Sequence, residues 1–139
     1  MICAYVDSSW KKSVAGFGVL IIDGVKSKVF SNYIPADNNN YGELWAIYQA
    51  AIFLAHRPGA VIYTDSQTAV SYVNDCIKDK ERTPEQYHQH MHMKVLAYQI
   101  RRLGVRCQFV KGHKDCIENE IADKLARQGR LKAHLTNQK

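Results

Sequence analysis

The chain has 139 residues, of which 46% are hydrophobic and 23% charged, values that are ordinary for one globular domain and exclude extensive disorder. It has four scattered cysteines without a Cys-x-x-Cys pair, no apolar stretch near the roughly 18 residues of a membrane span, and no signal-peptide pattern, so we expect a reduced, cytoplasmic protein. The net charge of +6 comes entirely from residues 70–139, which favours an anionic partner such as a phosphate backbone and no membrane partner.

The chain begins with a run that is typical of a buried strand ending in polar groups. Residues 2–6 are apolar, and Asp7, Ser8 and Ser9 follow them directly. Alternate residues of a strand point to opposite faces, and both faces of this one are largely apolar, as in a central strand covered on both sides. We therefore predict a strand in the middle of a sheet with the carboxylate of Asp7 at its tip.

Two more strands and a helix are predicted next. The runs 15–22 and 28–34 have strand character and are separated by Asp23-Gly24, a dipeptide that favours a tight hairpin turn. After Asn38–Asn40, apolar residues recur at helical spacing until Arg57-Pro58-Gly59 stops the helix. The first half of the chain is thus predicted as a three-stranded meander followed by one helix.

The next part of the chain alternates short strands with helices. Residues 60–64 form an apolar run that ends in Asp65, and a helical pattern follows at once. Pro84 begins a longer helix, which Gly104 closes. Residues 105–110 then alternate as a strand.

The chain ends with a predicted helix whose inner stripe is Ile117, Ile121 and Leu125. A basic C-terminal tail over residues 131–139 is expected to follow a single domain over residues 1–130. We find no internal repeat and no linker.

The predicted order of elements, βββαβααβα, indicates an α/β fold with a five-stranded mixed sheet and helices on both faces. Right-handed crossovers would place the fourth strand beside the first and parallel to it. Asp7 and Asp65 would then lie at one edge of the sheet, a strand spacing of roughly 5 Å apart. Open α/β sheets bind their ligands at that edge.

Two more acids could join this pair. Glu43 lies in the first turn of the predicted first helix, and Asp123 lies on the last helix, off its apolar stripe. Carboxylates around open coordination positions suit Mg²⁺ or Mn²⁺, and two such ions roughly 3.5 to 4 Å apart can clamp the attacking and leaving oxygens of a phosphate. Together the four acids indicate a metal-dependent site.

Each acid also has a structural alternative. Asp7 and Asp65 could begin turns or cap helices, which is the commoner role of a single Asp between a strand and a helix. Asn40-Tyr41-Gly42-Glu43 has the spacing of a capping box, and Asp123 could be a solvated helix residue. The coincidence of all four favours the metal site.

Several motifs occur in a fixed order from the first strand to the last helix. They are Asp7 after its apolar strand, Asn39–Ala46, Tyr63–Gln67, and Val110–His113 followed by Asn119–Ala126. In this order they resemble type 1 ribonuclease H. The resemblance implies an RNase H-like fold and an endoribonuclease that hydrolyses the RNA strand of RNA–DNA hybrids, leaving 5′-phosphate and 3′-hydroxyl ends.

The resemblance also implies roles for individual residues. Asp7 would bridge two Mg²⁺ or Mn²⁺ ions, and Glu43 and Asp65 would complete the ligands of one of them. Asp123 would help to hold the other ion, which activates water. His113, on a loop at the edge of the site, would help to move protons or release product, as an imidazole that titrates near neutral pH can.

Substrate recognition is assigned, by the same resemblance, to groups that can sense the 2′-hydroxyl, since this atom separates RNA from DNA. Asn39, Asn40 and Gln67 are the candidates, because amides both donate and accept hydrogen bonds. The backbone around Ser8 and Ser9 would lie close to the ribose. Turn and cap chemistry is the alternative role of the two asparagines. The implied partner is a hybrid, and we expect a monomer.

The chain departs from the family pattern in three places. Ser8 stands where the family usually has Gly after its first Asp, and Asp115 stands where it has Gly two residues past the loop histidine. The basic protrusion of some members is not evident, because cations and acids alternate over residues 78–82. Two alternatives stay open: a hybrid- or duplex-binding domain that has lost cleavage, and a nuclease of this fold that acts on DNA or double-stranded RNA.

Overall fold

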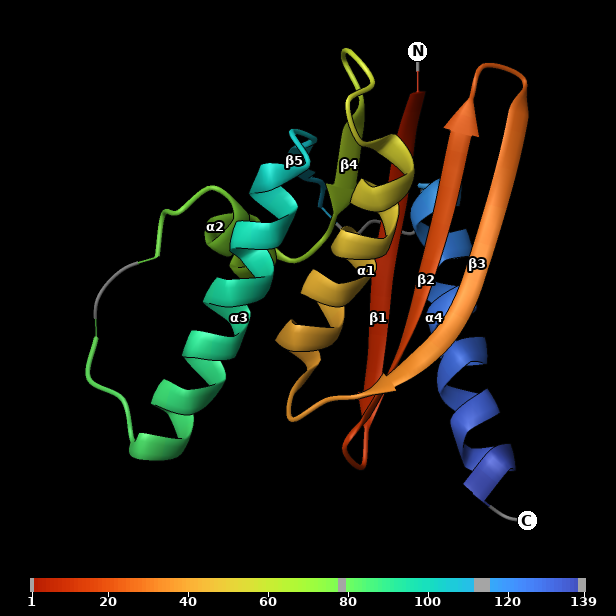
Figure 1. Ribbon diagram of the computed structural model, residues 1–139. Helices are drawn as coiled ribbons and strands as arrows, with labels where there is room; N and C mark the ends of the chain where they lie inside the picture. The colour runs from red at the N-terminus through yellow and green to blue at the C-terminus, as the bar shows by residue number, and fades with distance from the viewer. Residues whose placement is uncertain (1, 78–79, 112–115, 138–139) are drawn as a thin grey trace.

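The computed structural model describes residues 2–77, 80–111 and 116–137, and its elements follow the predicted order (Figure 1). They are β1 (Ile2–Lys11), β2 (Val14–Asp23), β3 (Lys26–Pro35), α1 (Asn39–Leu54), β4 (Val61–Thr64), α2 (Gln67–Val73), α3 (Pro84–Arg102), β5 (Arg106–Phe109) and α4 (Ile117–Asn137). The predicted α/β fold with a five-stranded mixed sheet is confirmed. Among the described helices, none has the length and apolar character needed to cross a membrane.

The five strands form one sheet in the order β3-β2-β1-β4-β5. β1, β2 and β3 form an antiparallel meander, whereas β4 pairs parallel with β1 and β5 pairs parallel with β4. The tight turn between β2 and β3 needs a left-handed residue, which Gly24 supplies with a φ of 62°. β4 lies beside β1, as predicted from a right-handed crossover through α1.

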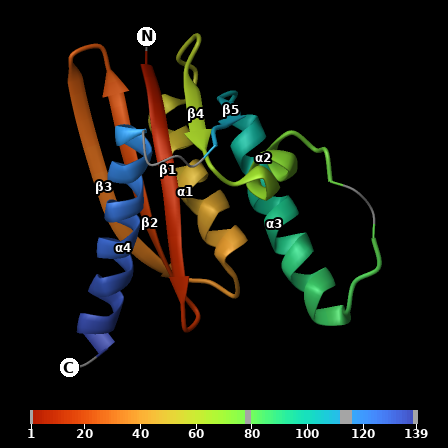
Figure 2. The same cartoon turned by 180° about the vertical axis from the view of Figure 1, so that it is seen from behind.

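Helices cover both faces of the sheet and give the molecule three layers (Figures 1 and 2). α1, α2 and α3 lie on one face, and α4 lies alone across β1, β2 and β3 on the other. The main core is on the first face, where Val6, Leu44, Ile62 and Ile100 are fully buried. Burial of each such aliphatic side chain contributes roughly 1.5 to 3 kcal/mol to folding. This core fixes α1 against the two central strands.

The contact between α4 and β2 is unusually close because glycine faces the helix backbone. A Cβ atom on Gly18 would lie 2.4 Å from the carbonyl oxygen of Ala122, and one on Gly16 would lie 2.1 Å from that of Ala126. No side chain fits at either position without moving the helix. The close approach brings the N-terminal turns of α4 near β1.

β1 is longer than predicted. It continues to Lys11 because β2 pairs with it along its whole length. Asp7 therefore lies inside the strand rather than at its tip. β4 pairs with β1 only as far as Val6 and Thr64, so Asp7 is the first residue of β1 beyond this neighbour.

The last helix differs from the prediction in two ways. It continues through Asn137, so the expected tail of residues 131–139 is largely helical, and Ala133 within it is buried. Ile117, predicted on the inner face, is 68% exposed. Small residues form the inner face instead, because the close approach to β2 leaves no room for larger ones. They include Ala122, Ala126 and Ala133.

Candidate active site

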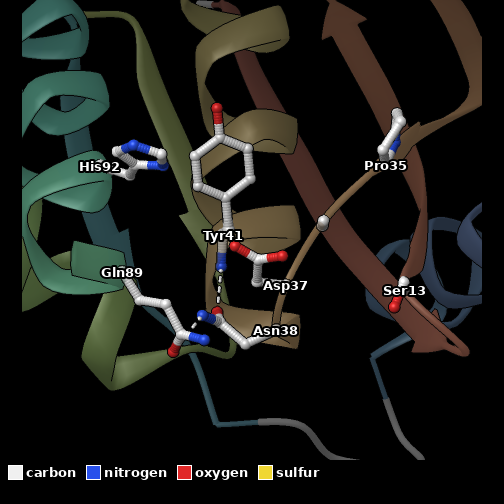
Figure 3. Close-up of a pocket in the computed structure, with 8 residues that line it drawn as sticks. Ser13, Pro35, Asp37, Asn38, Tyr41, Gln89 and His92 are labelled. Carbon is white, nitrogen blue, oxygen red and sulfur yellow. Dashed lines mark hydrogen bonds between the residues drawn. The ribbon is translucent and has the colours of Figure 1, made fainter. Parts of the chain in front are cut away.

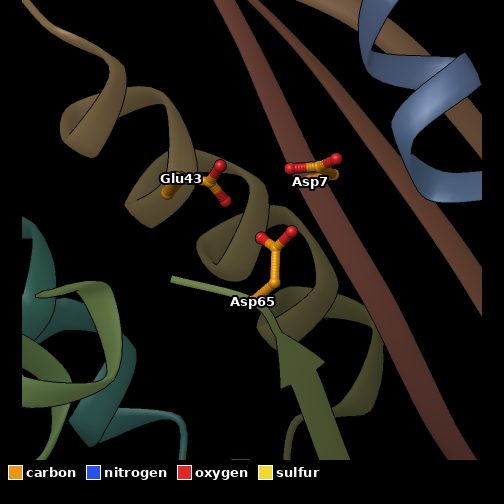
Figure 4. Close-up of side chains that lie close together, drawn as sticks. All are labelled: Asp7, Glu43 and Asp65. Carbon is orange, nitrogen blue, oxygen red and sulfur yellow. The ribbon is translucent and has the colours of Figure 1, made fainter. Parts of the chain in front are cut away.

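Three carboxylates from different elements converge beside the end of β4 (Figure 4). Asp7 belongs to β1, Glu43 to α1, and Asp65 directly follows β4. One oxygen from each carboxylate lies within 4.8 Å of those of the other two. Asp7 and Asp65 meet because each comes directly after the last residue pair between the parallel strands β1 and β4.

Glu43 reaches this cluster from the second turn of α1. The N-cap of α1 is Asn38, whose side chain accepts a hydrogen bond from the backbone N–H of Tyr41 at 2.9 Å. Glu43 lies too far beyond this cap to close a capping box, so that alternative is wrong. The side chain of Glu43 is buried, and its Oε2 has no hydrogen-bond partner among the described residues. A buried carboxylate oxygen without a partner fits a cation site.

The three carboxylates oppose each other's ionisation. Burial, and then the charge of Asp65, raises the pKa of Asp7 to about 7, although a hydrogen bond from the Ser8 N–H lowers it. Burial, and then the charge of Asp7, raises the pKa of Glu43 well above its usual value. Burial also raises the pKa of Asp65, against a hydrogen bond from Asn119 that lowers it. A divalent cation would favour the ionised forms, so the donor set fits Mg²⁺ or Mn²⁺.

Asp123 stands at the rim of the site. It lines the same open hollow of about 630 Å³ as the three carboxylates, and its charge contributes to the raised pKa values of Asp7 and Asp65. Its Oδ2 lies 2.5 Å from Nη2 of Arg127, one helical turn further along α4. The structure thus brings Asp123 to the site but pairs it with Arg127 outside the three-carboxylate cluster.

Four of the five predicted substrate-binding residues line one or both of two hollows. Ser8, Asn39 and Gln67 line the hollow of the carboxylates, and the Ser8 hydroxyl donates a hydrogen bond to Oδ1 of Asn39 at 2.9 Å. Asn40 lines a second hollow of about 770 Å³ between α2 and α3, which Gln67 shares. Ser9 is partly buried on β1 and lines neither hollow.

A third, smaller hollow of about 260 Å³ lies beside the start of α1 (Figure 3). Asn38 forms part of its wall and donates a hydrogen bond from Nδ2 to Oε1 of Gln89 on α3 at 3.2 Å. Tyr41 and His92 line the same space from α1 and α3. Asn38 also lines the second hollow, which in turn shares Gln67 with the hollow of the carboxylates.

Two residues of the site had no predicted role. Asn119 on α4 is buried, lies near Asp65 and lowers its pKa, and keeps a side-chain oxygen without a partner in the described part of the chain. Phe109, the last residue of β5, lines the hollow of the carboxylates. Asn119 precedes Asp123 by one helical turn, and this spacing was the available signal. Nothing local in the sequence marks Phe109.

The predicted proton-transfer residue His113 lies outside the described residues, and so does Asp115. The connection that contains them runs from β5 to α4, and both elements contribute residues to the hollow of the carboxylates. The roles of His113 and Asp115 stay predictions.

Comparison with protein-family models gives a match to RNase H over residues 1–131. The chain belongs to the RNase H family. A curated member, the ribonuclease H of Bordetella avium, is 32% identical over 120 residues, which cover 82% of this chain and 78% of the relative. The motifs that suggested the family therefore belong to a relationship along most of the chain.

Solved RNase H structures share the fold. RNase H1 from Halobacterium salinarum superposes with a TM-score of 0.70 at 18% identity, covering 95% of this chain and 98% of the other. LC11-RNase H1, solved in complex with an RNA/DNA hybrid, superposes with a TM-score of 0.60 at 23% identity, covering 96% of this chain and 99% of the other. The predicted family, fold and enzyme class are confirmed.

Proposed function

We propose that this RNase H hydrolyses the RNA strand of RNA–DNA hybrids with two divalent cations, Mg²⁺ or Mn²⁺, and leaves 5′-phosphate and 3′-hydroxyl ends. One observation carries this function: three carboxylates from β1, α1 and the end of β4 share one space, in which Glu43 keeps a buried oxygen without a partner among the described residues. The related fold of LC11-RNase H1, solved with an RNA/DNA hybrid, supports the choice of substrate.

Four acids of the chain would hold the cations. Asp7, Glu43 and Asp65 would ligate one, while Asp7 and Asp123 would ligate the other. When bound, the cations supply Lewis acidity at the phosphate and lower the pKa of a bound water. Asp123 would have to exchange Arg127 for a cation, and an exposed ion pair one turn apart costs only roughly 0.3 to 0.5 kcal/mol to break.

Neighbouring groups position these acids. The Ser8 N–H donates a hydrogen bond to Oδ1 of Asp7 at 2.8 Å, and the nearby Asn119 side chain lowers the pKa of Asp65. Such contacts fix the rotamers of metal-binding carboxylates and restrict which oxygens face the shared space. His113, carried by the connection from β5 to α4, would move protons at the edge of the site.

Amide side chains beside the acids would distinguish RNA from DNA. The Ser8 hydroxyl donates to Oδ1 of Asn39, so the Nδ2 group of Asn39 stays available to donate to a ribose oxygen. Gln67 lines both the carboxylate hollow and its neighbour, and it could contact the substrate on either side. Asn40 would act from the second hollow, and the backbone at Ser9 would approach the ribose from β1.

A comparison of substrates tests this function. The chain is incubated in Mg²⁺ or Mn²⁺ with end-labelled duplexes of one sequence: the RNA–DNA hybrid, double-stranded RNA and double-stranded DNA. We expect cleavage of the RNA strand in the hybrid alone, none in EDTA, and products whose 5′ ends lose phosphate to a phosphatase and whose 3′ ends a poly(A) polymerase extends. Hybrid binding without cleavage, or equal cleavage of DNA or double-stranded RNA, would contradict it.

A further inference from the structure

A second group of unpartnered polar atoms lies outside the carboxylate site, on the C-terminal half of α4. Nε of Arg130 and Nε2 of His134 are buried and have no hydrogen-bond partner among residues 2–77, 80–111 and 116–137. Among these described residues, two other buried side-chain atoms have no hydrogen-bond partner. They are Oε2 of Glu43 and Oδ1 of Asn119, both in the site. The unpartnered oxygens at one place suit a cation. At the other, Nε of Arg130 can only donate, Nε2 of His134 donates or accepts according to the ring tautomer, and both side chains are partly exposed, so the pair can offer donors to an anion.

Arg130 and His134 share one side of α4 with Asp123. From Asp123 the steps to Arg127, Arg130 and His134 are four, three and four residues, which is the spacing of one helix side. At about 1.5 Å of rise per residue, Arg130 and His134 lie roughly 10 and 16 Å along the helix axis from Asp123. The backbone of Arg130 packs against β2, since a Cβ atom on Gly16 would lie 2.2 Å from its amide nitrogen.

The neighbouring part of β1 continues this surface. Gly16 pairs with Ser9, and Ser9 shares a face of β1 with Asp7 and Lys11, because alternate residues of a strand point the same way. We call the surface the α4 track. Its members are Ser9, Lys11, Arg127, Arg130 and His134.

The charge of the α4 track has one sign. The sequence has no acid after Asp123 and none between Ser8 and Ile22, whereas Lys11 and Lys12 end β1 and open its turn. Arg127 is partly neutralised by Asp123, but Arg130 has no acid on the same helix to pair with beyond it. A cationic surface that begins at a phosphodiester-cleaving site suits the rest of the same phosphodiester strand.

We propose that the backbone of the bound nucleic acid continues from the carboxylate site along the α4 track, where Arg130 and His134 hold a phosphate. This inference rests on the proposed function, because it takes the hybrid as the ligand. Phosphate oxygens can accept hydrogen bonds from a guanidinium and an imidazole one turn apart. At about 3.4 Å of rise per nucleotide, the held phosphate lies roughly three to five steps from the scissile one, so the track contributes affinity and no chemistry.

Hybrid binding is measured apart from cleavage to test the track. Asp65→Asn is placed in every variant to stop cleavage, and the Kd of a fluorescent hybrid is followed by anisotropy in Mg²⁺ between about 50 and 200 mM salt. Arg130→Gln is expected to raise Kd about five- to tenfold and to reduce the slope of log Kd against log salt by roughly 0.7 to 0.9. Lys124→Gln removes the same charge from the exposed outer side of α4 and is the matched control, expected to change Kd by less than about twofold.

The outcomes separate the track from the proposed function. If the unsubstituted chain neither binds nor cleaves the hybrid, the proposed function fails. If it does both, and Arg130→Gln then binds like Lys124→Gln, the track is wrong. Arg130→Lys should restore most of the affinity by keeping the charge, and His134→Gln provides the same comparison if circular dichroism shows that Arg130→Gln does not fold.

Substrate length identifies the strand as the ligand. Hybrids shortened from one end or the other are compared, and the effect of Arg130→Gln should disappear on shortening from one end alone. An effect that persists with every hybrid, however short, would contradict a contact several nucleotides away. Inorganic phosphate is titrated in parallel, and binding of phosphate that depends on Arg130 without any effect on hybrid Kd would assign the site to a free anion instead.

Discussion

Asp65 tests the proposed chemistry at the scale of a single residue. Its carboxylate belongs to the three-acid cluster, and Asn keeps its shape while removing the charge that a cation needs. We expect Asp65→Asn to lower the rate of hybrid cleavage by roughly 10³-fold or more, since metal coordination supplies several kcal/mol. Asp75→Asn makes the same change at an exposed residue after α2 and should leave the rate unchanged. The measurement is the initial rate of hybrid cleavage in Mg²⁺, with circular dichroism to show that both variants fold. Retained activity in Asp65→Asn would count against the site.

Asp7 makes the stability of the metal-free protein depend on pH. Its pKa rises from 3.8 to about 7 on folding, so between these values the folded chain holds a proton that the unfolded chain has released. The contribution of Asp7 to the free energy of unfolding is therefore most favourable below about pH 4, and it becomes less favourable as pH rises toward 7. Each unit of pKa corresponds to about 1.4 kcal/mol, which gives a loss on the order of a few kcal/mol, shared with the coupled Glu43.

Asp7→Asn should remove this loss. In EDTA we expect its free energy of unfolding to exceed that of the unsubstituted chain at pH 8, and to differ little near pH 4. At pH 8, Mg²⁺ should remove this difference in the free energy of unfolding, because it stabilises the ionised cluster of the unsubstituted chain. Urea unfolding at both pH values, with and without Mg²⁺, provides the measurement. Parallel curves at the two pH values would mean that Asp7 is not protonated in the folded state.

At the scale of elements, the contact between α4 and β2 decides whether the site is complete, because α4 carries Asn119 and Asp123. A methyl group on Gly18 would lie 2.4 Å from the backbone oxygen of Ala122, which cannot rotate away. We expect Gly18→Ala to destabilise the fold by about 1 to 3 kcal/mol and to weaken Mg²⁺-dependent cleavage as α4 shifts. Gly24→Asn, at an open turn where Asn tolerates the left-handed conformation, is the control. Equal stability and activity in Gly18→Ala and Gly24→Asn would show that α4 can move away from β2 without cost.

The same contact explains which elements could not be predicted. The strands and α1 follow from local signals, namely apolar runs and turn residues. The inner face of α4 depends on its fit to the glycines of β2, about a hundred residues away in the chain, and Ala122 and Ala126 carry little hydrophobic periodicity. Ile117 was therefore assigned inward although it is exposed, and the helix was expected to stop before Ala133 although that residue is buried.

At the scale of the whole molecule, the order of elements was enough to predict the sheet and its carboxylate edge. The parallel crossover brings Asp7 beside Asp65 regardless of the conformation of the loops, so this pair could be predicted from topology. The separation of Asp123 from the cluster could not, because it depends on which partner Asp123 takes, and Arg127 one turn away competes with any cation. Periodicity places a residue on a helix face but does not choose its partner.

The molecule as a whole combines an acidic cluster with a net charge of +6. We expect the effect of the Asp7 carboxylate on hybrid binding to change sign when divalent cations are added. In EDTA at pH 8 the ionised Asp7 repels the phosphates of the hybrid, and Asp7→Asn should bind about two- to fivefold more tightly than the unsubstituted chain. In Mg²⁺ the same carboxylate holds a cation that attracts the phosphates, and Asp7→Asn should bind more weakly. The comparison uses anisotropy at constant ionic strength, with a hybrid analogue whose RNA strand carries 2′-O-methyl groups in both arms, so that cleavage is prevented while the other acids of the site are kept. A variant that binds more tightly under both conditions would mean that Asp7 repels the hybrid and recruits no metal to it.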